Sequence, residues 1–104
     1  MNQQVGFENN NQTLTVHPGD TITIQLNETL TAGYEWTTDD FTKDRCQLQS
    51  SGYTAAKSGA AGASGLRTMV FLITKKGDGS IRLKNHQRWS GDIDKTFSIG
   101  FHAE

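Results

Sequence analysis

The residues of this chain that could carry out chemistry are few and lie far apart. Cys46 is the one cysteine, and the three histidines, His17, His86 and His102, have no metal-ligand spacing among themselves or with it. A catalytic thiol needs a histidine close by and an environment that favours the thiolate. We therefore expect Cys46 to be an inert, half-buried side chain, and we expect no metal site.

Acidic and glycine-rich segments offer no better active site. Asp39-Asp40 and the two aspartates of 92–94 are explained by loop solvation, and the latter pair is too small a set of ligands for calcium. Segment 59–65 has a glycine at every third position, but it lacks the Gly-Lys-Ser/Thr ending and the following helix of a phosphate-binding loop. We therefore predict that the protein is not an enzyme and has no catalytic residue and no cofactor.

Composition argues against two further classes of partner. The 104 residues carry 10 Lys and Arg against 11 Asp and Glu, which gives a formal net charge of −1. A nucleic-acid-binding protein would concentrate basic residues on one face. No apolar run is long enough to span a membrane. We expect neither nucleic acid nor membrane as a partner, and we expect a periplasmic or secreted protein if a signal peptide was removed, otherwise a cytoplasmic or vesicular one.

The elements that must position any functional residue are strands, because apolar and polar residues alternate with a period of two. The alternation is clear in 21–26 and 96–101, whereas 66–74 is apolar on both faces and is expected at the centre of a sheet. Turn residues at Pro18-Gly19-Asp20 separate two strands, and Gly77-Asp78-Gly79 predicts a hairpin turn.

Several short strands with turn signals between them, and no convincing helix, predict an all-β protein. We expect an immunoglobulin-like antiparallel β-sandwich, without the Cys…Trp…Cys signature of antibody domains. The length predicts one domain over residues 1–104. Residues 1–10 are polar and rich in Asn and Gln, and we interpret them as a loose arm or an edge segment.

Three segments break the alternation and are the candidates for function. The first is Asn27–Trp36, the second is the small-residue segment 57–65, and the third is 86–94. Trp36 continues the strand pattern and is expected in the core, whereas Trp89 of the third segment either is exposed or folds back onto the sandwich. Loops at one end of a sandwich meet in space although they are far apart in sequence. We therefore expect three functional loops at one end.

These segments resemble the chagasin-type inhibitors of papain-like cysteine proteases, the inhibitor of cysteine peptidase family. That family carries Asn-Pro-Thr-Thr-Gly-Tyr/Phe-x-Trp in its first loop, Gly-x-Gly-Gly in its second and Arg-Pro-Trp in its third. In this chain the matching segments are 29–36, 62–65 and 87–89. The motifs are degenerate, because Thr29, Leu30, Ala32, Ser64, Gln87 and Arg88 depart from the family pattern.

The resemblance implies a reversible, tight-binding inhibitor that plugs the active-site cleft of a papain-like protease with three loops, and that is a monomer when free. The residues that would contact the protease are Thr29, Leu30, Thr31, Ala32 and Gly33 of loop 1, Gly62, Ala63, Ser64 and Gly65 of loop 2, and Gln87, Arg88 and Trp89 of loop 3. Tyr34 and Trp36 would pack beneath loop 1 and hold it rigid. The alternative is an immunoglobulin-like binding or adhesion module without protease inhibition.

Overall fold

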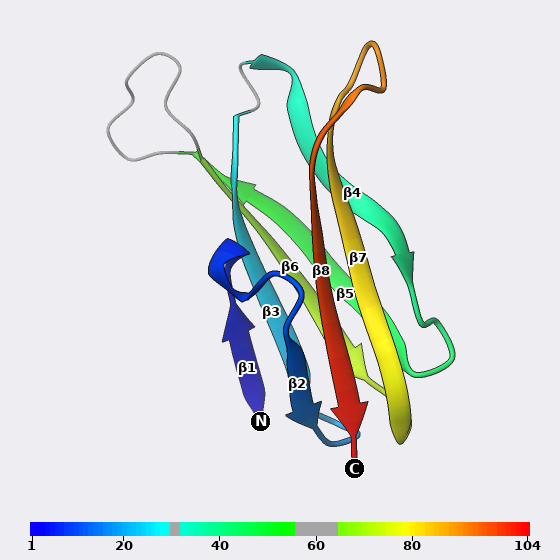
Figure 1. The fold of residues 1–104 in the computed structure, drawn as a ribbon. Helices are drawn as coiled ribbons and strands as arrows, with labels where there is room; N and C mark the ends of the chain where they lie inside the picture. The colour runs from blue at the N-terminus through cyan, green and yellow to red at the C-terminus, as the bar shows by residue number, and fades with distance from the viewer. Residues whose placement is uncertain (30–31, 56–64) are drawn as a thin grey trace.

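The computed structural model describes residues 1–29, 32–55 and 65–104 as two β-sheets packed face to face (Figure 1). The strands in these ranges, with a short 3-10 turn η1 at Phe7–Asn9, are β1 (Asn2–Val5), β2 (Thr13–Val16), β3 (Thr21–Glu28), β4 (Tyr34–Phe41), β5 (Cys46–Thr54), β6 (Gly65–Ile73), β7 (Gly77–Gln87) and β8 (Ile93–Ala103). One sheet has the order β1-β3-β6-β5 and the other has the order β2-β8-β7-β4. Within the described ranges, no helix is long and apolar enough to cross a membrane.

The two N-terminal strands, β1 and β2, each form the edge of a different sheet, and each runs parallel to its neighbouring strand. β1 pairs with β3 and β2 with β8 in this direction, whereas the remaining pairings among the described residues are antiparallel. Between the two strands, the Phe7 ring packs on Trp36 and Phe97 with centroid distances of 6.4 and 6.2 Å. The sequence left open whether residues 1–10 are a loose arm or an edge segment. Residues 2–5 form an edge strand, with Val5 buried.

The inward faces of the two sheets form a single hydrophobic cluster. Alternation decides which residues enter it: the buried apolar residues of β3 are Ile22, Ile24 and Leu26, and those of β8 are Phe97, Ile99, Phe101 and Ala103. The central position predicted for 66–74 is confirmed, because β6 lies between β3 and β5. Burying one large aliphatic or aromatic side chain contributes roughly 1.5–3 kcal/mol, so this cluster is the main source of stability.

The hairpin turn predicted at Gly77-Asp78-Gly79 is wrong. These residues begin β7 and pair with Ala103, His102 and Phe101 of β8. The chain leaves β6 and crosses to the other sheet through residues 74–76, so β6 and β7 are not hairpin partners. Glycine is needed at 77 because φ is 120°, and at 79 because the Phe101 ring occupies the place of a side chain.

The connections that carry the three predicted loops all leave the same end of the sandwich (Figure 1). Glu28 at the end of β3 pairs with Gly65 at the start of β6. Tyr34 at the start of β4 pairs with Gln87 at the end of β7, from which the chain passes to β8. Both termini lie at the opposite end, and we call the first end the loop end.

Candidate functional site

The loop end brings together the described members of the predicted site. Of the residues assigned to protease contact, Thr29, Ala32, Gly33, Gly65, Gln87, Arg88 and Trp89 lie in the described ranges. Leu30 and Thr31 of loop 1, and Gly62, Ala63 and Ser64 of loop 2, lie outside them. The stems of all three loops are described, and the stem of loop 1 contacts the stem of loop 2 and that of loop 3.

Loop 1 and loop 3 are joined at Gly33. The Arg88 amide donates a hydrogen bond of 2.9 Å to the Gly33 carbonyl. The six-membered ring of Trp89 rests on the Cα of Gly33, so that a Cβ there would overlap ring atoms Cη2 and Cζ3. Gly33 also has a φ of +82°, which an L side chain rarely adopts. Two independent constraints therefore require glycine at this position.

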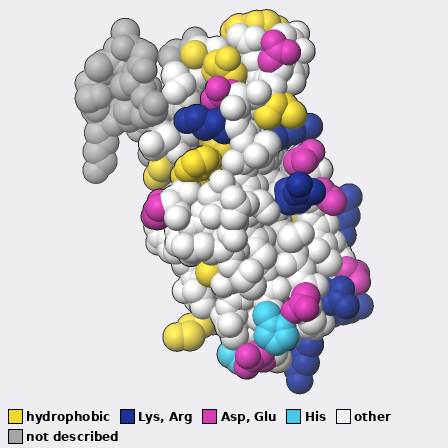
Figure 2. Space-filling view, viewed as in Figure 1, with side chains coloured by type: hydrophobic (Ala, Val, Ile, Leu, Met, Phe, Trp, Pro, Cys, Tyr) yellow, Lys and Arg dark blue, Asp and Glu magenta, His cyan; other side chains and the backbone are white. Residues whose placement is uncertain are grey.

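Trp89 lies on the surface, with 70% of its area exposed although one part of its ring contacts Gly33. The turn that carries it is closed by its own hydrogen bonds: the Gln87 amide donates to the Asp92 carbonyl at 2.9 Å, and the Gly91 amide donates to the Gln87 carbonyl at 2.7 Å. Of the two alternatives for Trp89, the structure has the exposed one. Figure 2 shows hydrophobic side chains more numerous toward the loop end of the viewed face, and ionisable ones more numerous toward the other end.

The base of loop 1 is fixed by Trp36. Its side chain is 2% exposed, and its indole N–H donates to the Asn27 carbonyl at 2.9 Å. The Thr29 carbonyl accepts hydrogen bonds from the amides of Ala32 (3.1 Å) and Tyr34 (3.3 Å). The two arms of loop 1 are therefore tied both through backbone and through the buried indole.

A buried ion pair lies directly beneath loop 1. The Glu28 side chain has no exposed area, and its carboxylate accepts from Arg67 Nη2 at 2.7 Å, from Arg67 Nε at 3.0 Å and from the Trp36 amide at 2.7 Å. The hydrogen bond to Glu28 raises the pKa of the Arg67 guanidinium. Glu28 and Arg67 belong to one sheet and Trp36 to the other, so the carboxylate links the two sheets.

Sequence reasoning missed this pair, although a signal for it was present. Glu28 continues the inward-facing series at 22, 24 and 26, and a carboxylate at an inward position requires a buried partner. The identity of the partner could not be read from the sequence, because Arg67 lies 39 residues away. Only the register of β3 on β6 places them together.

Arg67 also contacts residues at the base of loop 2. Arg67 Nη1 donates to Ser51 Oγ at 3.3 Å, and the guanidinium carbon lies 5.9 Å from the centroid of the Tyr53 ring. Tyr53 covers Gly65, where a Cβ would overlap the phenol ring and approach the Thr54 carbonyl. Arg67 thus contacts the arm that precedes loop 2 while itself lying on the arm that follows it.

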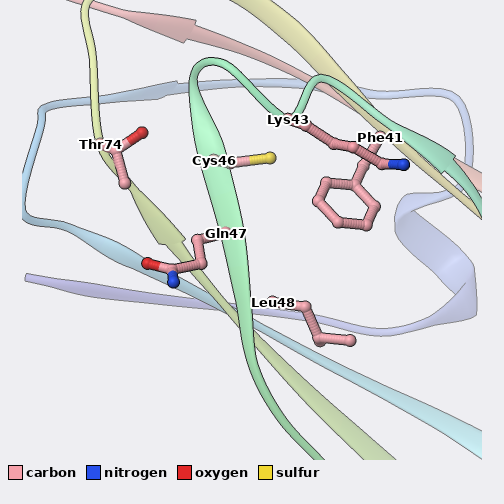
Figure 3. A pocket seen from close by; sticks show the side chains of 6 residues that line it. All are labelled: Phe41, Lys43, Cys46, Gln47, Leu48 and Thr74. Atoms are coloured by element: carbon pink, nitrogen blue, oxygen red, sulfur yellow. The ribbon is translucent and has the colours of Figure 1, made fainter.

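Cys46 lies at the end of the sandwich opposite the loops, and its side chain is buried. It is 1% exposed, which is deeper than the half-buried position expected, and it borders a hollow lined also by Phe41, Lys43, Gln47, Leu48 and Thr74 (Figure 3). Burial, with a smaller effect of the charge on Asp44, raises the pKa of the thiol to about 11. In the ranges that the structure describes, no three His, Cys, Asp or Glu side chains are grouped so as to hold a metal ion.

Comparison with known proteins places the chain in a family. Residues 15–101 match a family model described as Chagasin family peptidase inhibitor I42. A comparison with curated proteins found no match.

Solved structures share the fold over the full length of the chain. The cysteine protease inhibitor EhICP2 from Entamoeba histolytica is 21% identical with a TM-score of 0.87, covering 99% of this chain and 96% of that one. The solution structure of Amebosin is 24% identical with a TM-score of 0.83, covering 100% and 99%. PbICP-C, solved in complex with falcipain-2, is 15% identical with a TM-score of 0.69, covering 100% and 90%. These likenesses confirm the predicted β-sandwich.

We predict that Gly33→Ala displaces Trp89 from the loop 1 stem. Forcing an L side chain into a left-handed conformation costs about 1–2 kcal/mol, and the new methyl group would also occupy the place of the Trp89 ring. Gly19→Ala is the matched control, because Gly19 has a φ of +95° and no atom within 4 Å of its Cβ position. Both variants should lose stability in urea unfolding, but Gly33→Ala alone should shift the Trp89 indole resonance in NMR spectra. An unmoved indole resonance in Gly33→Ala would contradict the contact.

We also predict that the Cys46 thiol resists modification in the native protein. Because its pKa is raised to about 11 by burial, the folded form keeps the thiol proton while the unfolded form loses it near the ordinary pKa. The stabilisation that comes from the neutral, buried thiol is therefore complete below about pH 9. It declines as the pH rises to about 11, because the unfolded form is then stabilised by losing the proton. Urea unfolding of wild type and Cys46→Ala across this interval isolates the effect from that of other groups. Rapid reaction of the native thiol with a disulfide reagent at pH 8 would be inconsistent with this burial.

Proposed function

Because residues 15–101 match its family model, the chain belongs to the chagasin family of peptidase inhibitors, and we propose that it is a reversible, tight-binding inhibitor of papain-like cysteine proteases. This family is one of peptidase inhibitors and not of enzymes. EhICP2 is a cysteine protease inhibitor, and PbICP-C was solved in complex with falcipain-2. Both relatives support a cysteine protease as the partner of this chain.

The observation that carries the proposal is the exposed Trp89 held on Gly33 at the joined stems of loops 1 and 3. Four large hydrophobic side chains are exposed among the described residues, and two of these, Trp89 and Ile93, belong to the β7–β8 hairpin at the loop end. An exposed tryptophan on a closed turn is a typical binding hot spot. In the proposed complex Trp89 packs flat against the wall of the protease cleft.

Loop 1 is the segment proposed to cover the catalytic residues. A papain-like protease holds a thiolate–imidazolium pair at the floor of its cleft. An inhibitor that is not cleaved must lie over this nucleophile without offering a carbonyl in near-attack geometry. We assign this role to Leu30, Thr31 and Ala32, with Thr31 hydrogen-bonded near the catalytic cysteine. The small side chains of Thr31 and Ala32 suit such a tip, because bulky ones there would not reach the cleft floor.

Loop 2 is proposed to bind through its backbone. Gly62, Ala63, Ser64 and Gly65 present little side-chain bulk, so an extended backbone could approach the substrate-binding strand of the protease. Pairing of this kind requires few specific side chains. It would therefore tolerate proteases of differing sequence.

A preassembled loop end favours tight binding. Ordering a rotamer-rich side chain on association costs roughly 0.5–1.5 kcal/mol, and a stem already fixed by Trp36 and the Gly33–Trp89 contact avoids part of that cost. We propose that the free inhibitor is a monomer, with all three loops available to one protease.

Titration of papain tests the proposal. Wild type should abolish activity at a one-to-one ratio, and Trp89→Ala should raise the inhibition constant about 30-fold, which corresponds to about 2 kcal/mol. Thr31→Asp should be weaker still, because it brings a negative charge toward the thiolate. Thr15→Asp is the matched control, since Thr15 is exposed on β2 and should leave inhibition unchanged.

The outcomes separate the two functions drawn from the sequence. Absence of inhibition by the wild type at micromolar excess would favour an immunoglobulin-like binding or adhesion module. Inhibition by the wild type that neither Trp89→Ala nor Thr31→Asp weakens would instead contradict the assignment of the loops.

A further inference from the structure

We propose that Glu28 and Arg67 are positioning residues that fix loops 1 and 2 relative to each other for protease binding. We call this pair the Glu28–Arg67 clamp. The proposal rests on the inhibitory function proposed above, and it assigns a role in binding to two residues that do not belong to the loops.

The first step in the argument is the geometry of the pair. Both carboxylate oxygens of Glu28 accept from Arg67, Oε1 from Nη2 at 2.7 Å and Oε2 from Nε at 3.0 Å. Such a bidentate contact sets the orientation of both planar groups as well as their separation. The side chains are 0% and 12% exposed, so water competes little for these hydrogen bonds.

The second step is that Glu28 holds both arms of loop 1. It is the last residue of β3, immediately before the loop. Its Oε2 accepts from the amide of Trp36, which lies on β4 after the loop. The carboxylate therefore spans the loop at its base, across the boundary between the two sheets.

The third step is that Arg67 contacts both arms of loop 2. It lies on β6, two residues after Gly65, and its Nη1 donates to Ser51 on β5, before the loop. Its guanidinium carbon is 5.9 Å from the centroid of the Tyr53 ring, which covers Gly65. One residue of the clamp thus holds loop 1, the other holds loop 2, and the ion pair joins them.

A role in stability alone does not account for this arrangement. Transferring two charges from water into a protein interior costs about as much as their attraction returns, and an apolar pair of similar volume often stabilises a protein equally well. The charged pair differs from an apolar pair in being directional. Two loops that bind the same cleft need a fixed orientation relative to each other, and a directional ion pair between their stems supplies it.

The test is the double variant E28Q/R67M, which removes both charges and keeps a side-chain oxygen to accept from the Trp36 amide. We expect its melting temperature to stay within a few degrees of wild type while the inhibition constant against papain rises at least tenfold. The control is D78N/H102Q, which removes the exposed contact between Asp78 and His102 at the opposite end (2.6 Å) and should leave inhibition unchanged. A folded E28Q/R67M that inhibits as wild type does would overturn the proposal.

Two further measurements keep the result decisive. If E28Q/R67M does not fold, Arg67→Lys is tested in its place, because it keeps the charge but loses the bidentate geometry. It should raise the inhibition constant with the fold intact, and unchanged inhibition would overturn the clamp.

If wild type does not inhibit papain, the proposed function fails by itself, and amide exchange then tests the clamp. Faster exchange at 32–36 and 65–67 in the double variant than in wild type supports positioning, and equal exchange refutes it.

Discussion

A carboxylate buried between two sheets must be fully paired, and the loop end of this protein is built around that requirement. An unpaired charge in the interior costs several kcal/mol, so a charged Glu28 in the folded protein requires its contacts with Arg67 and the Trp36 amide. What the carboxylate adds is a defined relation between β3, β4 and β6 where they give rise to two of the loops.

Loop 3 is attached to this frame differently, through an aromatic ring and a glycine. The Trp89 ring rests on the Cα of Gly33 while most of its area stays in solvent. A polar network therefore supports loops 1 and 2 from below, and an apolar contact joins loops 1 and 3 at the surface. A backbone hydrogen bond from the Arg88 amide to the Gly33 carbonyl also joins loops 1 and 3.

The strands could be predicted from sequence because alternation is a local property. Ile22, Ile24 and Leu26 face the core as their spacing indicates. The prediction of a hairpin turn at Gly77-Asp78-Gly79 is wrong because glycines occur both at turns and at close contacts; here Gly79 faces the Phe101 ring within a strand. The alternation indicates that Glu28 faces inward, but neither its partner Arg67 nor the Gly33–Trp89 contact could be predicted, since both depend on strand register and packing between distant segments.

The placement of the termini has a practical bearing on how the molecule could be linked to something else. Both ends of the chain point away from the loops, so a fusion partner, a resin or a surface joined to either would leave the loops unobstructed (Figure 1). The two ends are not equivalent, however. The Met1 amine forms an ion pair of 2.9 Å with Asp20, and acylating it by an N-terminal extension would abolish that charge. Glu104 is exposed, and attachment through it would leave the Met1–Asp20 ion pair intact.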